Sequence, residues 1–418
     1  MDGKIEKIKS IDGFKYDNKR VLLRLDINSP IDQENKKIID DNRIRMSVPT
    51  LEYLLNRNAR VAIIAHQGDT LDYHNLIPLE EHAQKLSELL GRKVAYIDDV
   101  CGPAACDAVK NLKNGQAVIL GNLRYLVEEN STFEDVVKLQ AKDMLDTYLV
   151  RSLAPLVDYY VNDAFAAAHR NAPSMVAFQE ILPFAGGLLL KKEISALRKI
   201  MKAPARPNIF ILGGLKISDA FGMMEEVLES GSADAILTCG VTGNIMLMAK
   251  GYDLGQANKK FIKDRGLYDF VEDAQSYLKT YGDRIITPVD LAFEKDGARQ
   301  EISVESLPVN ELYTDIGSGS IELYKERIAT AGTIFFNGPV GVYENKLFEK
   351  GSREIWNAVA NSKAYSVIGG GDTVSAAGHF IDIDKIDYVC TAGGAMVRFL
   401  SGVKMPLIEA MVKGPKKI

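Results

Sequence analysis

The sequence predicts an α/β protein with two mainly parallel sheets, each flanked by helices, and a helix that connects them. Its 418 residues, 46% of them hydrophobic, are enough for roughly two or three domains. Short β-branched apolar runs alternate with longer segments that carry Leu, Ala and Ile at helical spacing. That alternation is typical of βα units around a parallel sheet. It occurs in two series separated by one long helical pattern, which indicates two lobes.

The expected elements follow this rhythm along the chain. The first series has four expected strands, at residues 21–25, 60–65, 116–120 and 158–162. The second has six, at residues 208–212, 235–239, 284–288, 333–337, 365–368 and 388–391. Between them Gly186 and Gly187, either a hinge or the turn that starts a helix, precede a helical pattern that stops before Pro204. We expect a first lobe over 1–184, a connecting helix over 185–203, a second lobe over 204–400, and a tail over 401–418 that packs back on the first lobe.

The composition of the chain argues against several classes of binding partner. Lys and Arg number 51 against 56 Asp and Glu, a net charge of -5 without a basic block, which argues against a nucleic-acid or polybasic membrane surface. No apolar run reaches the roughly 18 residues of a membrane span, and the polar start lacks a secretory signal. Four cysteines without a CxxC pair and five scattered histidines disfavour zinc and disulfides. We therefore expect a soluble, cytoplasmic protein whose partners are small molecules, and we infer no oligomeric state.

Charged side chains follow the strands of the first series. Open α/β sheets bind ligands beyond the carboxyl ends of their strands. Any single arginine there is more often half of a surface ion pair. Several arginines together, each with a planar fork for phosphate or carboxylate, indicate a site for a small anionic metabolite. The residues are Asp26, Asn28, His66, Arg124 and Arg170, with Arg43 from an expected loop at residues 40–50.

In the second series, the positions that follow the strands carry glycine instead of charged residues. Residues 212–216 and 368–373 each join a strand to a helical pattern, and such turns let backbone N–H groups approach phosphates. Lys216 could neutralise a phosphoryl group, and Asp372 could hold the Mg²⁺ of a nucleotide. Neither turn matches the P-loop or the GxGxxG pattern, and each could be only a tight connection. Glu344, after a turn at 337–341, could bind a ribose or be an ordinary solvated residue.

The order of these segments along nearly the whole chain resembles the phosphoglycerate kinase family. The matching segments are LRLDINSP, DNRIRMSVPT, AHQG, GNLRY and VNDAFAAAHR in the first half, and LGGLKISD, TPVD, DIG, FNGPVGVYE, IGGGDT and TAGGA in the second. HQG and NDAFAAAHR are most similar to archaeal members. The resemblance implies two Rossmann-like lobes and reversible phosphoryl transfer between 1,3-bisphosphoglycerate with ADP and 3-phosphoglycerate with ATP, a step of glycolysis and gluconeogenesis.

The resemblance also implies roles for individual residues. Arg43 and Lys216 would act on the transferring group, and closure about the connecting helix would bring the two substrates in line. The phosphoglycerate contacts would be Asp26, Asn28, Arg43, His66, Arg124 and Arg170. The nucleotide contacts would be Gly214, Lys216, Asn337, Pro339, Glu344, Gly370, Gly371, Asp372 and Thr373. The cofactor would be Mg²⁺ with ATP or ADP, held by Asp372 and the nucleotide phosphates.

Two positions depart from the family pattern. Asp69 stands where many members have a phosphate-binding arginine, and Ala220 where many have a second lysine. A carboxylate beside a phosphate weakens binding unless another cation compensates. Two alternatives therefore stay open, a paralogous kinase for another small carboxylate and a non-catalytic binding protein with the same fold.

Overall fold

A computed structural model describes residues 8–68 and 75–413, so Asp69 lies outside the described residues. The chain divides into two compact units, each described by itself below. The first comprises Met1–Ile194 and Lys404–Ile418, and the second Ser195–Val403. Helix α9, Leu188–Lys202, contains the point of division between Ile194 and Ser195.

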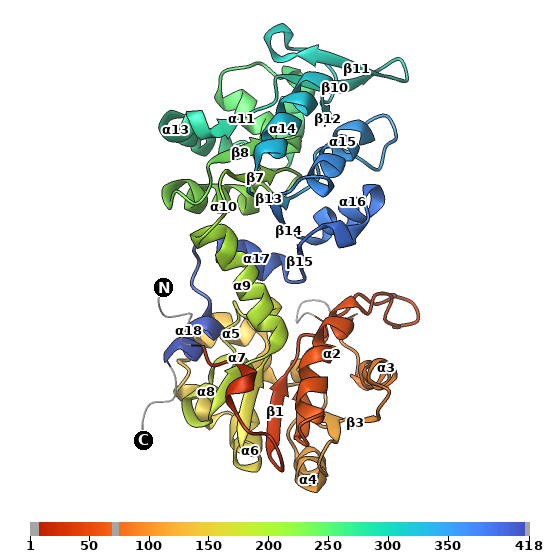
Figure 1. Ribbon diagram of the computed structural model, residues 1–418, viewed down its shortest axis with the longest axis vertical. Coiled ribbons are helices and arrows are strands. Elements are labelled where there is room, and N and C mark those ends of the chain that lie inside the picture. Colours follow the sequence, from red (N-terminus) through yellow and green to blue (C-terminus); the bar gives the residue numbers. More distant parts are fainter. Residues whose placement is uncertain (1–7, 69–74, 414–418) are drawn as a thin grey trace. The chain divides into compact units, whose positions relative to one another are not determined.

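The first unit contains a six-stranded, wholly parallel sheet (Figure 1). Its strand order is β3-β4-β2-β1-β5-β6. The chain therefore places β2, β3 and β4 on one side of β1 and then β5 and β6 on the other side. Ligand sites in such sheets lie at the carboxyl ends of the strands where the order reverses, here beside β1 and β5. The strands are β1 Arg20–Arg24, β2 Arg60–Ile64, β3 Val94–Tyr96, β4 Ala117–Ile119, β5 Tyr159–Asn162 and β6 Phe184–Gly186.

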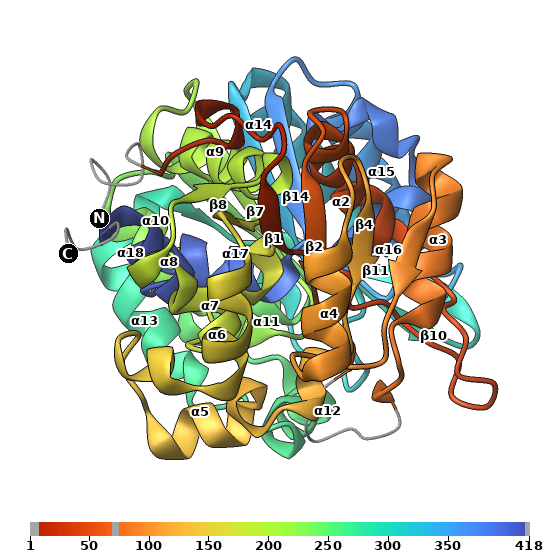
Figure 2. The same cartoon turned by 90° about the horizontal axis from the view of Figure 1, so that it is seen from below.

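Helices cover both faces of this sheet, as right-handed crossovers require. Figure 2 shows α2 on one side of β1 and β2 and α4 on the other. On the α2 side, Val21 and Leu23 of β1 belong to one core with Ile44 and Leu51 of α2. The intervening Leu22 is fully buried too, which explains why the strands read as continuous apolar runs. The helices are α2 Asn42–Leu55, α3 Glu80–Leu90, α4 Pro103–Asn111, α5 Ser131–Val137, α6 Tyr148–Leu153, α7 Pro173–Val176 and α8 Phe178–Ile181, with short 3₁₀ turns η1 Ile11–Gly13, η3 Leu123–Tyr125, η4 Val127–Glu129, η5 Asp143–Asp146, η6 Ala154–Leu156 and η7 Phe165–Ala167.

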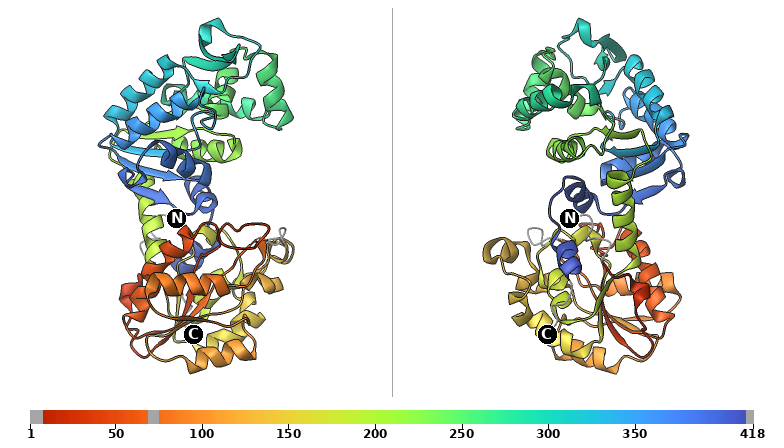
Figure 3. Two further views of the ribbon diagram at one scale, coloured as in Figure 1. Left: turned by 90° about the vertical axis from the view of Figure 1, so that its right-hand side faces the viewer. Right: turned by 60° about the vertical axis from the view of Figure 1, so that its left-hand side comes forward.

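The C-terminal helix α18, Pro406–Lys413, belongs to the first unit although the second unit precedes it in the chain. It packs against α7, α8 and β6, and Figure 3 shows it in blue beside the yellow helices of this unit. Leu407 and Met411 are buried there. The main-chain N–H of Leu407 donates to Ala168 O (3.2 Å), so this helix also supports the segment that leads to Arg170.

The second unit has a six-stranded parallel sheet of order β15-β14-β13-β7-β8-β9. Helices α10, α11 and α13 pack together, as do α14, α15 and α16 (Figure 1). The strands are β7 Asn208–Leu212, β8 Ala235–Thr238, β9 Ile285–Ile286, β13 Thr333–Asn337, β14 Tyr365–Gly369 and β15 Tyr388–Cys390. The helices are α10 Ile217–Glu229, α11 Gly240–Ala249, α12 Gly255–Asp264, α13 Phe270–Tyr281, α14 Ser318–Thr330, α15 Glu349–Ala360, α16 Gly371–Phe380 and α17 Gly393–Leu400, with 3₁₀ turns η8 Gly282–Arg284, η9 Val304–Ser306 and η10 Ile383–Lys385.

The fold class predicted from the sequence is confirmed, with some differences in detail. A small antiparallel sheet of order β11-β10-β12 was not expected, and it comprises β10 Asp290–Lys295, β11 Ala298–Ser303 and β12 Asp315–Ile316. Arg43 was expected on a loop, yet it lies in the first turn of α2, a helix that also contains Pro49. The buried face formed by Ile44, Leu51 and Leu54 outweighs the hydrogen bond that a proline removes from a helix interior.

The start of α9 is tied to the carboxyl end of β5. Gly187 N–H donates to Asn162 O (2.9 Å), and Leu190 N–H donates to the buried carboxylate of Asp163 (2.8 Å). A Cβ on Gly187 would lie 2.2 Å from Asp163 Oδ1, so only glycine allows this approach. Burial, reinforced by Glu193, raises the pKa of Asp163 to about 7 against the hydrogen bonds it accepts from Thr50 and Leu190.

Asp163→Asn should reduce the pH dependence of stability. The folded chain holds the Asp163 proton more tightly than the unfolded chain, so the stabilisation is complete below about pH 4 and is lost as the pH rises through about 7. The asparagine keeps an acceptor for Leu190 N–H and does not ionise. Between pH 5 and pH 8 the variant should lose roughly 1–3 kcal/mol less stability than the parent. Denaturant unfolding at both pH values measures this, and parallel losses in the two proteins would contradict it.

No helix in the described part of the chain is long and apolar enough to cross a membrane.

Candidate active site

The residues predicted for anion binding come together at the carboxyl ends of strands β1, β2, β4 and β5. We call Arg24, Arg43, His66, Arg124 and Arg170 the arginine cluster. Arg24 ends β1, His66 follows β2, and Arg124 lies in η3 after β4. Arg43 comes from the first turn of α2, and Arg170 follows η7 after β5. Strand order therefore assembles residues that are far apart in the sequence.

Asp26 and Asn28 support this cluster from the segment after β1. The Arg43 guanidinium lies 3.2 Å from the buried carboxylate of Asp26, while about a third of its side chain remains exposed. Asn28 Oδ1 accepts a hydrogen bond from Gly68 N–H (2.9 Å), which joins the segments after β1 and β2. Arg43 is thus held in place by one partner and still accessible to a ligand.

Arg124 and Arg170 are both held by Glu129. Arg124 Nη1 donates to the main-chain oxygen of Glu129 (2.8 Å) and Arg124 Nε to Gly68 O (3.2 Å). Arg170 Nη2 donates to the same Glu129 oxygen (3.4 Å), and its Nε pairs with Glu134 (2.6 Å). The shared carbonyl brings two guanidinium groups to one point, where an anion could contact both.

The pKa of His66 reflects the arginines that lie near it. This pKa lies well below the usual value because the part-buried ring is desolvated and because Arg24, Arg124, Arg170 and Arg43 all repel a proton from it. Every arginine of the cluster is therefore close enough to act on one imidazole. Such an array of cations favours a multiply charged anion.

Sequence reasoning missed three members of this region. Arg24 is only 2% exposed, Glu129 only 4%, and Ser174 is fully buried between them. Arg24 Nε donates to Ser174 Oγ (3.3 Å), and Ser174 donates to Glu129 through both Oγ and N–H (2.7 Å each). The sequence did contain a signal for Arg24, because a charged residue at the end of the otherwise apolar run VLLR is unusual. Nothing in the sequence pairs residue 129 with residue 174.

In the second unit, glycine residues let the turns after β7 and β13 touch through their backbones. We call residues 213–216, 337–339 and 370–373 the glycine-rich edge. A Cβ on Gly213 would lie 2.3 Å from Pro339 O, and one on Gly338 would lie 2.1 Å from Gly213 O. Gly214 N–H donates to Pro339 O (2.9 Å), and Gly214 and Gly338 both have positive φ angles. Because no side chain fits between these two turns, their main-chain N–H groups can lie close to a ligand.

Polar side chains complete the glycine-rich edge. Lys216 precedes α10, and its Nζ lies 3.2 Å from Asp372 Oδ2 in the first turn of α16. Both side chains are about two-thirds exposed, so their pairing is weak and readily exchanged for other partners. Thr373 Oγ1 accepts from Gly338 N–H (2.7 Å), and Asn337 Nδ2 donates to Gly369 O (2.7 Å). Two helix N-termini therefore begin at one place, a favourable site for phosphate.

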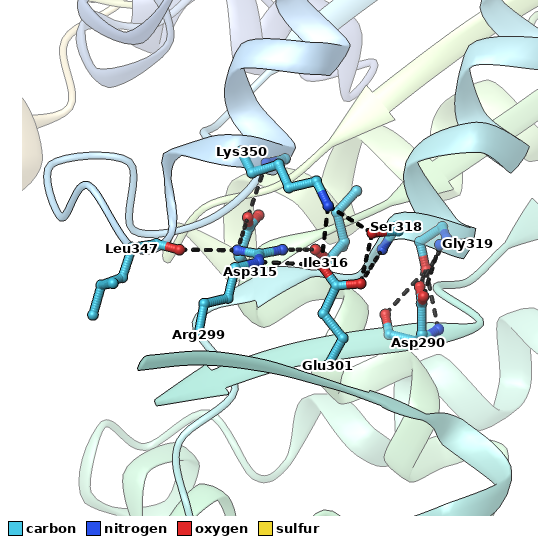
Figure 4. Close-up of polar contacts among 11 residues, drawn as sticks. Asp290, Arg299, Glu301, Asp315, Ile316, Ser318, Gly319, Leu347 and Lys350 are labelled. Carbon is cyan, nitrogen blue, oxygen red and sulfur yellow. Dashed lines mark hydrogen bonds and ion pairs between the residues drawn. The ribbon is translucent and has the colours of Figure 1, made fainter. Parts of the chain in front are cut away.

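Glu344 lies on the exposed segment between β13 and α15, apart from these contacts. Partial burial raises the pKa of Tyr343, and the nearby carboxylates of Glu344 and Asp372 add to the rise, so these two carboxylates lie in its neighbourhood. Val342 N–H donates to Thr314 O (2.8 Å), so one side of the segment is fixed to the residue before β12. Further along, Arg299 donates to Leu347 O (3.2 Å) within the polar network of Figure 4.

Within residues 8–68 and 75–413 no group of three His, Cys, Asp or Glu side chains could hold a metal by itself. Mg²⁺ commonly binds through one or two carboxylates, several waters and the phosphates of its nucleotide. The exposed carboxylate of Asp372, beside the N-terminus of α16 and Lys216, fits such a site.

A family model for phosphoglycerate kinase matches residues 11–403. The chain belongs to the phosphoglycerate kinase family. The phosphoglycerate kinase of Methanothermus fervidus is 41% identical over 411 residues, 98% of each chain. That of Methanococcus maripaludis is 41% identical and covers 98% of this chain and 99% of its own. The crystal structure of the Pyrococcus horikoshii enzyme matches with a TM-score of 0.85 at 39% identity, covering 97% of this chain and 98% of that one. The Coxiella burnetii structure matches at 0.83 and 31% identity, covering 97% and 99%.

Family membership confirms the function predicted from the sequence. The chain is a phosphotransferase of the phosphoglycerate kinase type, with a carboxyl group as acceptor. Several of the relatives are archaeal, in agreement with the resemblance seen in the HQG and NDAFAAAHR segments.

Proposed function

We propose that the arginine cluster binds the phosphoglycerate and that the glycine-rich edge binds the nucleotide. The observation that carries the first part is the convergence of the arginine cluster at the carboxyl ends of parallel strands, where Arg124 and Arg170 share the Glu129 carbonyl. A phosphate and a carboxylate or acyl phosphate on one small molecule require several cations at fixed positions. In this proposal residues 1–184 form the phosphoglycerate lobe and residues 204–400 the nucleotide lobe.

Within the first lobe, each residue has a distinct task. We assign Asp26, Asn28, His66, Arg124 and Arg170 to the substrate. Asn28 and Asp26 orient their neighbours through Gly68 and Arg43, while Arg124 and Arg170 supply guanidinium donors from the Glu129 carbonyl. Arg43, exposed at the start of α2, is the residue we place beside the transferring phosphoryl group.

Within the second lobe, the nucleotide phosphates would lie at the N-termini of α10 and α16. Gly214, Gly370 and Gly371 permit close approach of main-chain N–H groups, Asn337 and Pro339 shape the opposing turn, and Thr373 anchors it. Lys216 would move from Asp372 to a phosphate, and Asp372 would then be available to the Mg²⁺ that accompanies the nucleotide. We assign Glu344 to the nucleotide ribose.

Phosphoryl transfer between these ligands requires positioning and charge neutralisation more than covalent chemistry. A carboxylate is already an anionic nucleophile, so no general base is needed. Arg43 and Lys216 would neutralise the charge on the group in flight, and bound Mg²⁺ would polarise the nucleotide phosphates. We propose that closure of the two lobes about residues 185–203 accompanies turnover, because direct transfer requires the ligands to meet and water to be excluded.

A coupled assay with 3-phosphoglycerate and Mg-ATP tests the proposal. We expect ATP-dependent formation of ADP that needs both 3-phosphoglycerate and Mg²⁺. A series of other small carboxylates in the same assay examines the paralogue alternative, and a better substrate among them would overturn the choice of phosphoglycerate. A folded sample without turnover would overturn the enzyme as proposed.

Thr373→Val should weaken nucleotide binding selectively. The change leaves the Gly338 N–H without its buried acceptor, which loosens the contact between the turns after β13 and β14. We expect the KM for ATP to rise about three- to tenfold and the KM for 3-phosphoglycerate to stay within twofold. Thr242→Val is the matched control, since Thr242 is also buried and its Oγ1 has no hydrogen-bond partner among the described residues. A rise in both Michaelis constants would contradict a local role.

We propose the cytoplasm as the compartment. All four cysteines, at positions 101, 106, 239 and 390, are free thiols, which suits a reducing environment. The two substrates are small molecules, and the proposal includes neither nucleic acid nor membrane as a partner. Cell fractionation with an antibody to the chain would test the assignment.

A further inference from the structure

We infer that Arg24, paired with Glu129 through Ser174, is a positioning residue that holds His66 in one neutral tautomer. Arg24 Nη2 lies 2.8 Å from His66 Nδ1. A guanidinium has donors only and keeps its proton at every pH that a protein tolerates, so Nδ1 must be the acceptor. A neutral imidazole carries one proton, which therefore resides on Nε2.

The Arg24 guanidinium is buried and held by two further hydrogen bonds. It is 2% exposed, and it donates from Nε to Ser174 Oγ and from Nη1 to Leu25 O. The guanidinium plane is fixed by these two contacts, and Nη2 is thereby aimed at the imidazole. Within the arginine cluster, Arg24 therefore differs from Arg43, Arg124 and Arg170, because it acts on the ligand through His66 and not by direct contact.

Glu129 supplies the countercharge that a buried guanidinium needs. Its carboxylate accepts both hydrogen bonds of Ser174, and Ser174 in turn accepts from Arg24, so the two charges are joined by one residue. Burial lowers the pKa of Arg24, and Glu129 is the strongest influence that opposes this. The carbonyl of Glu129 also holds Arg124 and Arg170. One buried residue thus organises three of the four arginines.

Protonation of His66 would convert Nδ1 to a donor facing the N–H of Arg24. The same ring faces Arg43 from α2, Arg124 from η3 and Arg170 from the segment after η7, all of them cations. His66 should therefore stay neutral through the physiological pH range and offer a ligand an Nε2–H donor without a change of charge. This inference rests on the proposed function only for the statement that the ligand is phosphoglycerate.

Imidazole nitrogen NMR on the full-length protein labelled with ¹⁵N-histidine tests the tautomer without any substrate. His66 is assigned by the loss of its signals in His66→Gln. Between pH 5.5 and pH 8 we expect an unprotonated Nδ1 and a protonated Nε2. A Nδ1–H tautomer, or a ring doubly protonated at pH 6.5, would overturn the inference whatever the enzyme's activity.

The role of Arg24 is tested by the pair Arg24→Met and Glu129→Gln made together, which removes both buried charges and so avoids stranding one. In the double variant Nδ1 of His66 loses its fixed donor, so the neutral ring should show both tautomers, and the KM of the enzyme for 3-phosphoglycerate should rise about three- to tenfold. The KM for ATP should stay the same. Arg20→Met, at the part-buried first position of the same strand, is the control and should change neither property. An unchanged His66 spectrum in the double variant would show that Arg24 does not set the tautomer.

Discussion

Arg43→Ala should lower kcat by roughly 100- to 1,000-fold, the loss typical when one donor to a developing charge is removed. The KM for 3-phosphoglycerate should rise much less, because Arg124, Arg170 and His66 remain for ground-state binding. The physical reason is the position of Arg43, held by Asp26 at 3.2 Å yet still accessible. A group that acts mainly on the phosphoryl in flight contributes to the transition state more than to either bound substrate.

Arg45→Ala is the matched control for this experiment. Arg45 lies on the same helix two positions away, is well exposed, and pairs with Asp41 at 2.9 Å. Its removal should leave kcat within about twofold, as for most exposed ion pairs. Arg43→Lys keeps the charge but loses the planar fork, and its kcat should fall between those of the parent and the alanine variant. An unchanged kcat in Arg43→Ala, or a loss confined to KM, would contradict the role given to this residue.

The sequence predicted the sheets best where strands are long and fully buried. Asn208–Leu212 and Thr333–Asn337 have the predicted bounds because five apolar-rich residues in a row leave little choice of structure. Strands β3 and β6 were missed since each has only three residues and no strong apolar run. The hairpin of β10 and β11 did leave a signal that was overlooked. Its turn is Asp296-Gly297, both with positive φ, the pattern most typical of a tight hairpin.

The residues of the candidate site also differ in how well the sequence predicts them. Residues such as Asp26, His66 and Arg124 could be predicted because any charged residue directly after a parallel strand lies at the same edge of the sheet. Glu129 could not, since its importance depends on contacts with Ser174, Arg124 and Arg170, which only the folded chain brings together. Sequence patterns identify the side chains that face a ligand more readily than the buried residues that hold them.

Arg299→Leu should destabilise the second unit by about 3–5 kcal/mol, because it leaves a buried carboxylate without its cation. Arg299 Nη1 donates to Asp315 at 2.8 Å (Figure 4). The Asp315 side chain has no exposed surface. Arg299 Nη2 donates to Ile316 O (2.8 Å) and Nη1 also to Leu347 O (3.2 Å). Asp315 in turn accepts from Gly351 N–H (2.8 Å) at the start of α15. The Arg299–Asp315 ion pair therefore joins β12, the segment before α15, and α15 itself.

The cost of Arg299→Leu should depend on pH in a definite direction. Burial already raises the pKa of Asp315 to about 6 although Arg299 and Gly351 oppose the rise. Without the arginine the pKa rises further, so the carboxyl is neutral at pH 5 and the penalty shrinks there, while it is complete at pH 8. Arg299→Leu with Asp315→Asn should recover part of the loss at pH 8, because no buried charge then remains. A penalty equal at both pH values would contradict this account.

Urea unfolding followed by tryptophan fluorescence measures these changes in the stability of the second unit. The chain has a single tryptophan, Trp356, which is fully buried in α15 and stacked on Phe336 with ring centroids 4.1 Å apart. Arg327→Leu, an exposed position on α14, is the control and should change stability by less than about 0.5 kcal/mol. A loss below about 1 kcal/mol for Arg299→Leu would mean that Asp315 finds another partner. The expected loss would also release Leu347, so the segment that carries Glu344 depends on the same buried ion pair.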